Sequence, residues 1–189
     1  MVSDTRVRMV EGAARLLAQR GLQETSFSEV LELTGAPRGS IYHHFPSGKD
    51  QLIASAIDLA GDRAIRLIDE MVGASAVDVT TGFLGMWRLV LAKSNFQAGC
   101  SVLAVTIATD SADLLDHAST VFRLWRERLA ELLQDGGLPP TDAIRFAATL
   151  IAASEGAVVV SRAEQDLEPF DLVAEQLVSL VEGLAVRRA

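Results

Sequence analysis

The sequence has a single cysteine, Cys100, so no disulfide can form within the chain. Cysteine-poor chains are typical of reducing, intracellular compartments. No uninterrupted apolar run approaches the roughly 18–20 residues that a membrane-spanning helix needs. The opening residues MVSDTRVRMVEG also hold no apolar core of a signal peptide. We therefore expect a soluble, cytoplasmic protein.

The chain also lacks the excess of positive charge that nucleic-acid-binding proteins often carry. Its 17 Lys and Arg residues are outnumbered by 25 Asp and Glu residues, which gives a net charge of −8. The balance is uneven, because residues 1–52 carry six basic and six acidic side chains whereas residues 53–189 carry 11 and 19. The acidic excess lowers non-specific affinity for DNA but does not exclude oriented contacts from the neutral opening segment.

Strand-like alternation of apolar and polar residues is missing, and helical periodicity runs through the chain. The pattern predicts an all-α fold of about nine helices, an N-terminal three-helix helix-turn-helix unit fused to a C-terminal helical bundle. We expect Ser26 and Glu29 to form a capping box and Ser47 to cap the fourth helix. The expected domains are 1–46 and 47–189, and the expected helices are 3–20, 26–35, 37–45, 47–71, 78–94, 100–108, 111–134, 141–164 and 169–187.

Residues 26–52, SFSEVLELTGAPRGSIYHHFPSGKDQL, contain the most informative pattern. They read as a helix, a glycine turn, a short second helix with Pro37 in its first turn, and a third helix. Ile41 and Phe45 are four residues apart and are expected to anchor the inner face of the short helix. Such an arrangement holds a polar helix at a surface, as reading a DNA groove requires.

This segment resembles the DNA-binding region of TetR-family transcriptional regulators. The resemblance is carried by GSIYHHF at 39–45, followed by Pro46, Ser47 and Lys49. Residues APRGS at 36–40 and GCSV at 99–102 resemble the LmrA/YxaF-like branch of that family. The chain departs from the usual patterns at Pro37, where Ser is more common, and at Ser101, where many relatives of the branch have Pro.

The resemblance implies a set of DNA contacts around the short helix. Arg38 can grip guanine or a phosphate, and Gly39 lets the backbone approach DNA closely. A cation at the start of a helix opposes the helix dipole, so Lys49 suggests a docked phosphate, although a solvated surface lysine is the alternative. Packing between helices is an equally good reading of His44. The predicted DNA-binding residues are Thr25, Ser26, Arg38, Gly39, Ser40, Tyr42, His43 and Lys49, with Ser26 also explained as a helix cap.

Catalytic and metal sites find little support in the sequence. No pattern pairs Cys100 with a histidine, and adjacent histidines point in different directions from a helix. We therefore expect neither an enzyme nor a metal or cofactor site. The rival hypothesis is a small-molecule-binding or enzymatic helical protein with a vestigial DNA-binding unit, which the acidic balance mildly supports.

The second half of the chain suggests a small-molecule pocket and a dimer surface. The candidate ligand-binding residues are Phe83, Trp87, Phe96, Cys100, Phe122, Trp125, Ser154 and Glu155, for which plain core packing is the alternative. The last two helices carry small residues and an apolar stripe suited to a homodimer or to internal packing: Ala147, Ala148, Ala152, Gly156, Ala157, Val173, Leu177, Leu180 and Leu184. Together with the resemblance, these features predict a dimeric repressor that binds a palindromic operator in double-stranded DNA. A hydrophobic aromatic molecule would release it from that operator.

Overall fold

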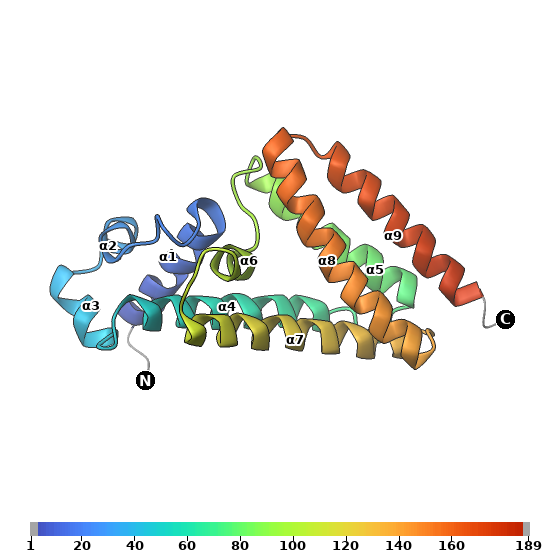
Figure 1. Ribbon diagram of the computed structural model, residues 1–189, viewed down its shortest axis with the longest axis horizontal. Coiled ribbons are helices and arrows are strands. Elements are labelled where there is room, and N and C mark those ends of the chain that lie inside the picture. The colour runs from blue at the N-terminus through green and yellow to red at the C-terminus, as the bar shows by residue number, and fades with distance from the viewer. Residues whose placement is uncertain (1–3, 187–189) are drawn as a thin grey trace. The chain divides into compact units, whose positions relative to one another are not determined.

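The computed structural model describes residues 4–186, and within that range the chain forms nine α-helices and no strand (Figure 1). The predicted all-α fold is therefore confirmed. The helices are α1 (Asp4–Arg20), α2 (Phe27–Thr34), α3 (Arg38–His44), α4 (Lys49–Asp69), α5 (Ala76–Lys93), α6 (Ser101–Thr106), α7 (Ala112–Asp135), α8 (Pro140–Glu164) and α9 (Glu168–Val186).

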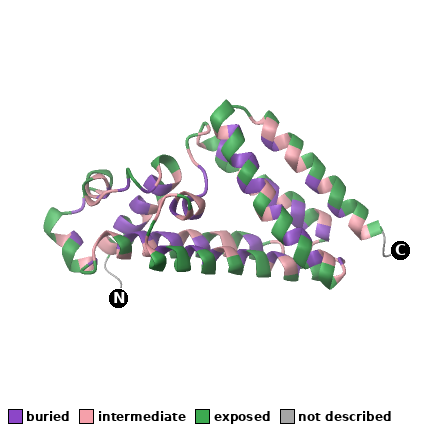
Figure 2. Ribbon diagram, in the orientation of Figure 1, coloured by how far each residue is buried: buried purple, intermediate pink, exposed green. Residues whose placement is uncertain are grey.

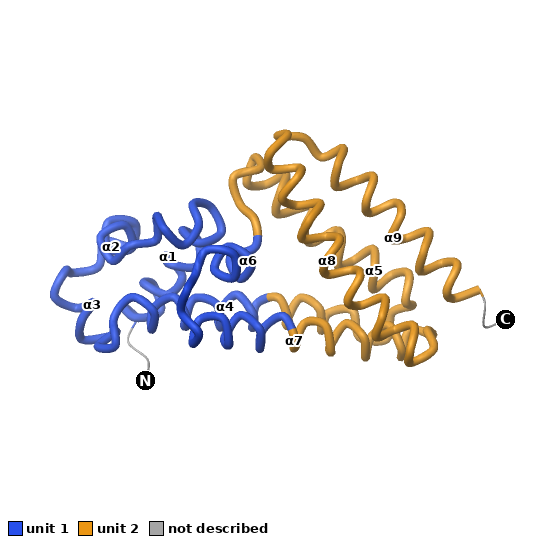
Figure 3. Tube along the Cα trace, viewed as in Figure 1, with its two compact units in different colours: residues 1–63, 100–122 blue, residues 64–99, 123–189 orange. Residues whose placement is uncertain are grey.

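The chain divides into two compact units, drawn in blue and orange in Figure 3. Unit 1 comprises residues 1–63 and 100–122, and unit 2 comprises residues 64–99 and 123–189. Two of the three boundaries fall inside α4 and α7, so each of these long helices belongs to both units, and the third lies between α5 and α6. The compact units thus differ from the expected 1–46 and 47–189 division, which remains a proposal about function.

Unit 1 is built on α1, which packs against α2 and α6, while α2 packs against α3. Gly12 allows the close approach of α1 and α2, because a Cβ atom there would lie 2.6 Å from Cγ2 of Thr34. The side chains of Met9, Ala13 and Leu17 on α1 are almost completely buried. These contacts hold α2 in place as the support for α3.

In unit 2, α5, α8 and α9 pack against one another. Ser75 caps the N-terminus of α5, since its hydroxyl accepts a hydrogen bond from the backbone N–H of Asp78 at 3.1 Å. The turn after α7 packs directly on this start, where the Ala76 N–H donates to the Gly136 carbonyl at 3.0 Å. Backbone therefore meets backbone at Gly136.

Helix α8 is long and apolar enough to cross a membrane by length and composition alone, although it contains Arg145 and Glu155. Half of its apolar window is buried inside unit 2, as a core helix of a globular protein would be. Figure 2 shows buried residues along α8 beside an exposed face. Core packing of α8 in unit 2 accounts for its hydropathy.

Two helix starts differ from the sequence expectation. Helix α4 begins at Lys49, and the backbone N–H of Ser47 donates to Oε1 of Gln51 at 3.1 Å, in place of the expected Ser47 side-chain cap. At α2, the Ser26 hydroxyl accepts from the Glu29 N–H at 3.2 Å, as predicted. The Glu29 carboxylate, however, pairs with Arg20 at 2.8 Å instead of completing a capping box.

Candidate functional site

Helix α3 is held to unit 1 by its two predicted anchors. Ile41 is 1% exposed and Phe45 is fully buried. The turn before α3 contains Gly35 in the left-handed conformation, with φ of 63°, and Pro37 in an extended conformation that begins the helix. The guanidinium of Arg6 lies 5.3 Å from the centroid of the Phe45 ring and also donates to Ser55, which ties the end of α3 to α1 and α4.

The opposite face of α3 is presented to solvent by Arg38, Gly39, Tyr42 and His43. Tyr42 is 69% exposed, a large fraction for an aromatic residue on a folded domain. No salt bridge to Arg38 is found within the described residues 4–186, so its guanidinium is available to a ligand. Anchored on one side and polar on the other, α3 has the form of a recognition helix.

The conformation and packing of unit 1 do not require glycine at position 39. Its φ is not positive, and a Cβ atom built there meets no heavy atom within 4 Å. Gly39 lies within α3 and not in a turn. Because glycine is about 1 kcal/mol worse than alanine in a helix interior, the empty space over Gly39 fits the close approach of an external partner.

Tyr42 is oriented by a residue that the sequence reasoning missed. The rings of Phe27 and Tyr42 meet edge to face, with centroids 5.7 Å apart and planes at 89°. Phe27 is the first residue of α2, so the contact joins the two helices of the helix-turn-helix. An aromatic residue directly after the Ser26 cap was the only available signal, and it does not specify its partner.

Ser40 uses its hydroxyl donor inside the protein, at 2.6 Å from the Pro37 carbonyl, and keeps lone pairs to accept from a ligand. The imidazole rings of His43 and His44 lie 5.1 Å apart, with His43 exposed and His44 half-buried. The intermediate burial of His44 fits the packing interpretation. Ser40 can thus act as an acceptor toward a partner.

Two predicted contacts have structural roles. Thr25 is 1% exposed and its hydroxyl donates to the Gly21 carbonyl at 2.8 Å, so this side chain has a structural partner. Its contact with DNA stays a prediction. Lys49 donates to the Leu22 carbonyl at 3.0 Å. An ammonium has three donors, so Lys49 still has two for a phosphate.

The predicted ligand-binding residues are distributed over both units. Cys100 and Phe122 belong to unit 1 and the other six belong to unit 2. Phe83, Trp125, Ser154 and Glu155 are buried, while Trp87, Phe96 and Phe122 are half-buried. The Ser154 hydroxyl donates to the Ile151 carbonyl at 3.0 Å, one turn back along α8.

Cys100 and Phe96 have backbone roles. The Cys100 sulfur accepts the Leu103 N–H at 3.3 Å and caps α6, which accounts for a buried thiol without catalysis. Arg162 on α8 donates to the carbonyls of Phe96 and Gln97, each at 3.2 Å. A Cβ atom at Gly99 would lie 2.8 Å from this guanidinium, so a side chain there would displace the end of Arg162.

Comparisons with known proteins agree with the helix-turn-helix geometry. Residues 9–56 match the model of bacterial regulatory proteins of the tetR family, and residues 76–176 match that of the transcriptional regulator LmrA/YxaF-like C-terminal domain. The chain is similar to the HTH-type transcriptional regulator Rv0196 of Mycobacterium tuberculosis, with 37% identity over 183 residues and 93% of each chain covered. It is 26% identical to the regulator YxaF of Bacillus subtilis, over 94% of this chain and 95% of YxaF.

Among solved structures, the regulatory protein TetR from Rhodobacter sphaeroides superposes with a TM-score of 0.84 at 20% identity. The match covers 94% of this chain and 98% of that one, so the two share a fold. The family matches and the Rv0196 relationship establish the family as well. The chain belongs to the TetR family of transcriptional regulators, in its LmrA/YxaF-like branch, and is a DNA-binding regulator rather than an enzyme.

Proposed function

We propose that this regulator is a ligand-responsive repressor that binds its operator through the exposed face of α3. The observation that carries the proposal is the juxtaposition of exposed Arg38 and Tyr42 with the empty space over Gly39. Residues at the start of a recognition helix reach base edges in the major groove. Arg38 supplies the forked donors that suit guanine or a phosphate, and Tyr42 and His43 supply further polar contacts.

Phosphate contacts flank this face. Lys49 lies at the first turn of α4, where free N–H groups and the helix dipole favour an anion. Ser26 keeps its hydroxyl hydrogen to donate to a phosphate, because its oxygen accepts the Glu29 N–H. Ser40 has given its donor to the Pro37 carbonyl, so it can only accept, for example from a base amino group. Both stay secondary candidates. The proposed functional division assigns DNA binding to residues 1–46, assisted by Lys49, and assigns effector binding and dimerisation to residues 47–189.

The proposed homodimer uses the exposed face of α8 and the neighbouring face of α9. Ala148, Ala152 and Gly156 are exposed on α8 at spacings of four residues, and the space over Gly156 is open. Small residues at this spacing let a second helix approach closely. A two-fold dimer would present two α3 helices to successive major grooves, roughly 34–36 Å apart, and would read a palindrome.

Several residues assigned to the dimer surface from sequence pack inside unit 2 instead. Ala147 and Ala157 are buried on α8, and Leu177 is 4% exposed on α9. Leu180 is 43% exposed and Leu172, which was not predicted, is 61% exposed. The proposed surface on α9 therefore lies on the side of Leu172 and Leu180, which is a different face of the helix from the one that buries Leu177.

The proposed effector is a hydrophobic aromatic molecule bound by unit 2 in the cytoplasm. Family resemblance supports this class, and Phe83, Trp125, Ser154 and Glu155 combine aromatic rings with buried polar atoms in that unit. An effector acts by binding one conformation of the dimer better than another, so its differential affinity sets how far DNA binding is weakened.

The test is fluorescence anisotropy with labelled DNA from upstream of the regulator's own gene, titrated at several salt concentrations. Arg38→Ala should weaken operator binding roughly 5- to 150-fold, as expected for a bidentate base contact of about 1–3 kcal/mol. Lys93→Ala, at an exposed position on α5, is the matched control and should bind as the wild type does. Equal affinity of the Arg38 and Lys93 variants would refute the proposed docking. A panel of aromatic compounds added to the complex then tests release.

A further inference from the structure

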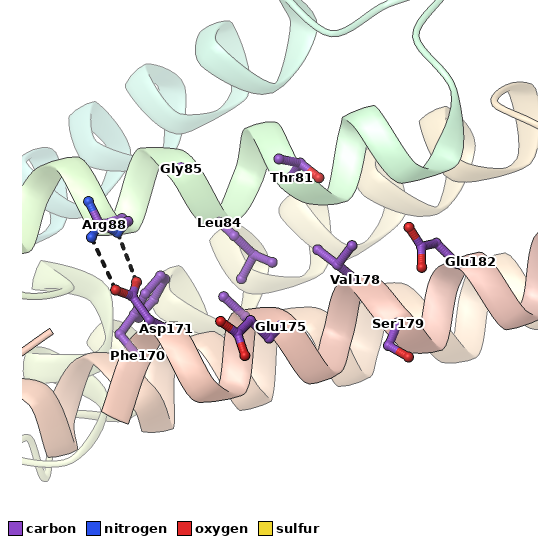
Figure 4. A pocket seen from close by; sticks show the side chains of 11 residues that line it. Thr81, Leu84, Gly85, Arg88, Phe170, Asp171, Glu175, Val178, Ser179 and Glu182 are labelled. Carbon is purple, nitrogen blue, oxygen red and sulfur yellow. Dashed lines mark hydrogen bonds and ion pairs between the residues drawn. The ribbon is translucent and has the colours of Figure 1, made fainter. Parts of the chain in front are cut away.

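A groove runs along unit 2 between α5 and α9 (Figure 4), apart from the residues that sequence analysis selected for ligand binding. Its volume is about 510 Å³, within the range of about 300–1,000 Å³ that small-molecule sites occupy. The lining comes from these two helices alone: Thr81, Leu84, Gly85, Arg88, Phe170, Asp171, Ala174, Glu175, Val178, Ser179 and Glu182.

The floor of the groove is apolar. Leu84 and Phe170 are 4% and 1% exposed, and Val178 is half-buried beside them. Figure 4 shows Leu84 from α5 and Val178 from α9 between the two helices. Above this floor, Gly85 contributes no side chain, and a Cβ atom built there meets nothing within 4 Å. The groove therefore has room for an apolar body in contact with its floor.

One end of the groove is closed by an ion pair. Nε and Nη2 of Arg88 donate to the two carboxylate oxygens of Asp171 at 2.8 and 3.0 Å. The hydrogen bonds and the charge of Asp171 raise the pKa of Arg88. Because this bidentate pair neutralises the only cation of the groove lining, Arg88 does not attract an anionic ligand.

The other charges of the groove are negative and lack such partners. Glu175 and Glu182 are exposed, lie seven residues apart on α9, and flank Val178. Neither forms a salt bridge within the part of the chain that the structure describes. One arginine against three carboxylates leaves the lining with a net charge of −2.

From this complementarity we infer that the groove binds an amphipathic organic cation, with its flat apolar body over Leu84 and Gly85 and its cationic group between Glu175 and Glu182. Thr81 and Ser179 supply hydroxyls at the rim for a polar substituent. A neutral aromatic molecule would gain nothing from the two carboxylates, and an anion would be repelled by them. Binding of the cation in the groove does not depend on the proposed function; only its role as an effector of DNA binding does.

The experiment uses three naphthalene probes that differ in charge: naphthylmethyl-trimethylammonium, naphthylmethanol and naphthylacetate. Isothermal titration calorimetry with the full chain should show the cation binding at least about tenfold more tightly than either other probe, and more weakly as salt rises. An exposed charge pair contributes about 0.2–1 kcal/mol, so Glu175→Gln and Glu182→Gln should each weaken binding of the cation roughly 1.5- to 5-fold. Glu127→Gln on α7, also exposed in unit 2, is the charge-matched control and should change nothing.

A second pair of variants tests the location of the site without touching a charge. Gly85→Leu fills the space above the floor and should abolish binding of the cation, whereas Gly85→Ala keeps most of the space and should retain it. Both substitutions favour the helix, so thermal unfolding at or above the wild-type temperature excludes misfolding. The proposal would be overturned if Gly85→Leu bound the cation as tightly as the wild type does, or if the wild type bound all three probes with equal affinity.

Two readouts separate this inference from the repressor proposal. If the cation binds in the groove but leaves the operator complex intact, the site stands and its role as the effector site fails. If the cation does not bind while the upstream DNA is still bound, the groove proposal fails and the DNA-binding proposal stands. A change in oligomeric state caused by Gly85→Leu alone, measured by sedimentation, would identify the groove as an interface with a second copy and refute the cation site.

Discussion

Replacing Gly39 by alanine separates the stability of α3 from its function. The substitution adds one methyl group at an exposed helical position, and nothing in the described part of the chain lies within 4 Å of the new atom. Glycine is about 0.8–1.0 kcal/mol less favourable than alanine in a helix interior. Because Gly39 is the second residue of a short helix, we expect Gly39→Ala to stabilise the protein by at most this amount. The melting temperature should then rise by at most about 2–4 °C for a chain of this size.

The effect on DNA binding should have the opposite sign. A methyl group between α3 and a closely approaching sugar-phosphate backbone would displace the helix and lengthen the hydrogen bonds of neighbouring Arg38 and Ser40. Losing one or two hydrogen bonds of about 1 kcal/mol each predicts a roughly 5- to 30-fold weaker operator complex. Few substitutions raise stability and lower binding in this way, so the combination is diagnostic of a glycine kept for close approach.

The assay pairs differential scanning fluorimetry with fluorescence anisotropy on the upstream DNA. Ser119→Ala, at an exposed position on α7, is the matched control, because it also replaces a poorer helix former by alanine. It should stabilise the protein and leave operator affinity unchanged. If Gly39→Ala binds the operator as tightly as the wild type, DNA does not approach α3 at this residue and the docking that we propose is wrong.

Three further changes test other parts of the structure. Phe27→Leu removes an aromatic contact of about 0.5–1.5 kcal/mol and should weaken operator binding roughly 2- to 10-fold. Because Tyr42 is the only tyrosine, fluorotyrosine labelling should give a single fluorine NMR signal, and this signal should shift in the variant. Gly136→Ala would place a Cβ atom 2.5 Å from the backbone nitrogen of Ala76 and should cost about 1–3 kcal/mol or more in urea denaturation; wild-type stability would contradict this close approach. Ala152→Glu puts like charges on the proposed dimer face and should produce a folded monomer in sedimentation experiments, whereas a persistent dimer would assign the interface elsewhere.

Local sequence signals predicted the recognition unit well where a single helix determined the outcome. The four-residue spacing of Ile41 and Phe45 identified the buried side of α3, and the Ser26 hydroxyl caps α2 as predicted. These features depend on periodicity and on hydrogen bonds within one turn, which the sequence encodes directly. The same periodicity left Arg38 and Tyr42 on the outer face.

Features that depend on how two helices meet could not be predicted in this way. The ring contact of Phe27 with Tyr42 requires the relative placement of α2 and α3. Thr25 looked like an exposed polar residue in a turn, but its hydroxyl is buried on the Gly21 carbonyl. On α8, Ala147 is buried and Ala148 is exposed, although a run of alanines offers no pattern to distinguish them.

The arrangement of charge in unit 1 bears on how this acidic regulator achieves specificity. Two of its arginines, Arg8 and Arg20, are paired with Asp4 and Glu29 and are partly neutralised. Near the recognition helix, the guanidinium of Arg6 is held against the Phe45 ring and Ser55, which leaves Arg38 and Lys49 as the cations proposed to contact DNA. We therefore expect few counterions to be released from DNA per protomer, and non-specific binding, which depends on that release, to be weak. Operator affinity must then come from base contacts and close fit at α3. A protein that binds random DNA weakly needs only a moderate specific affinity to find its site, so the acidic balance that at first argued against a DNA-binding function is compatible with a selective repressor.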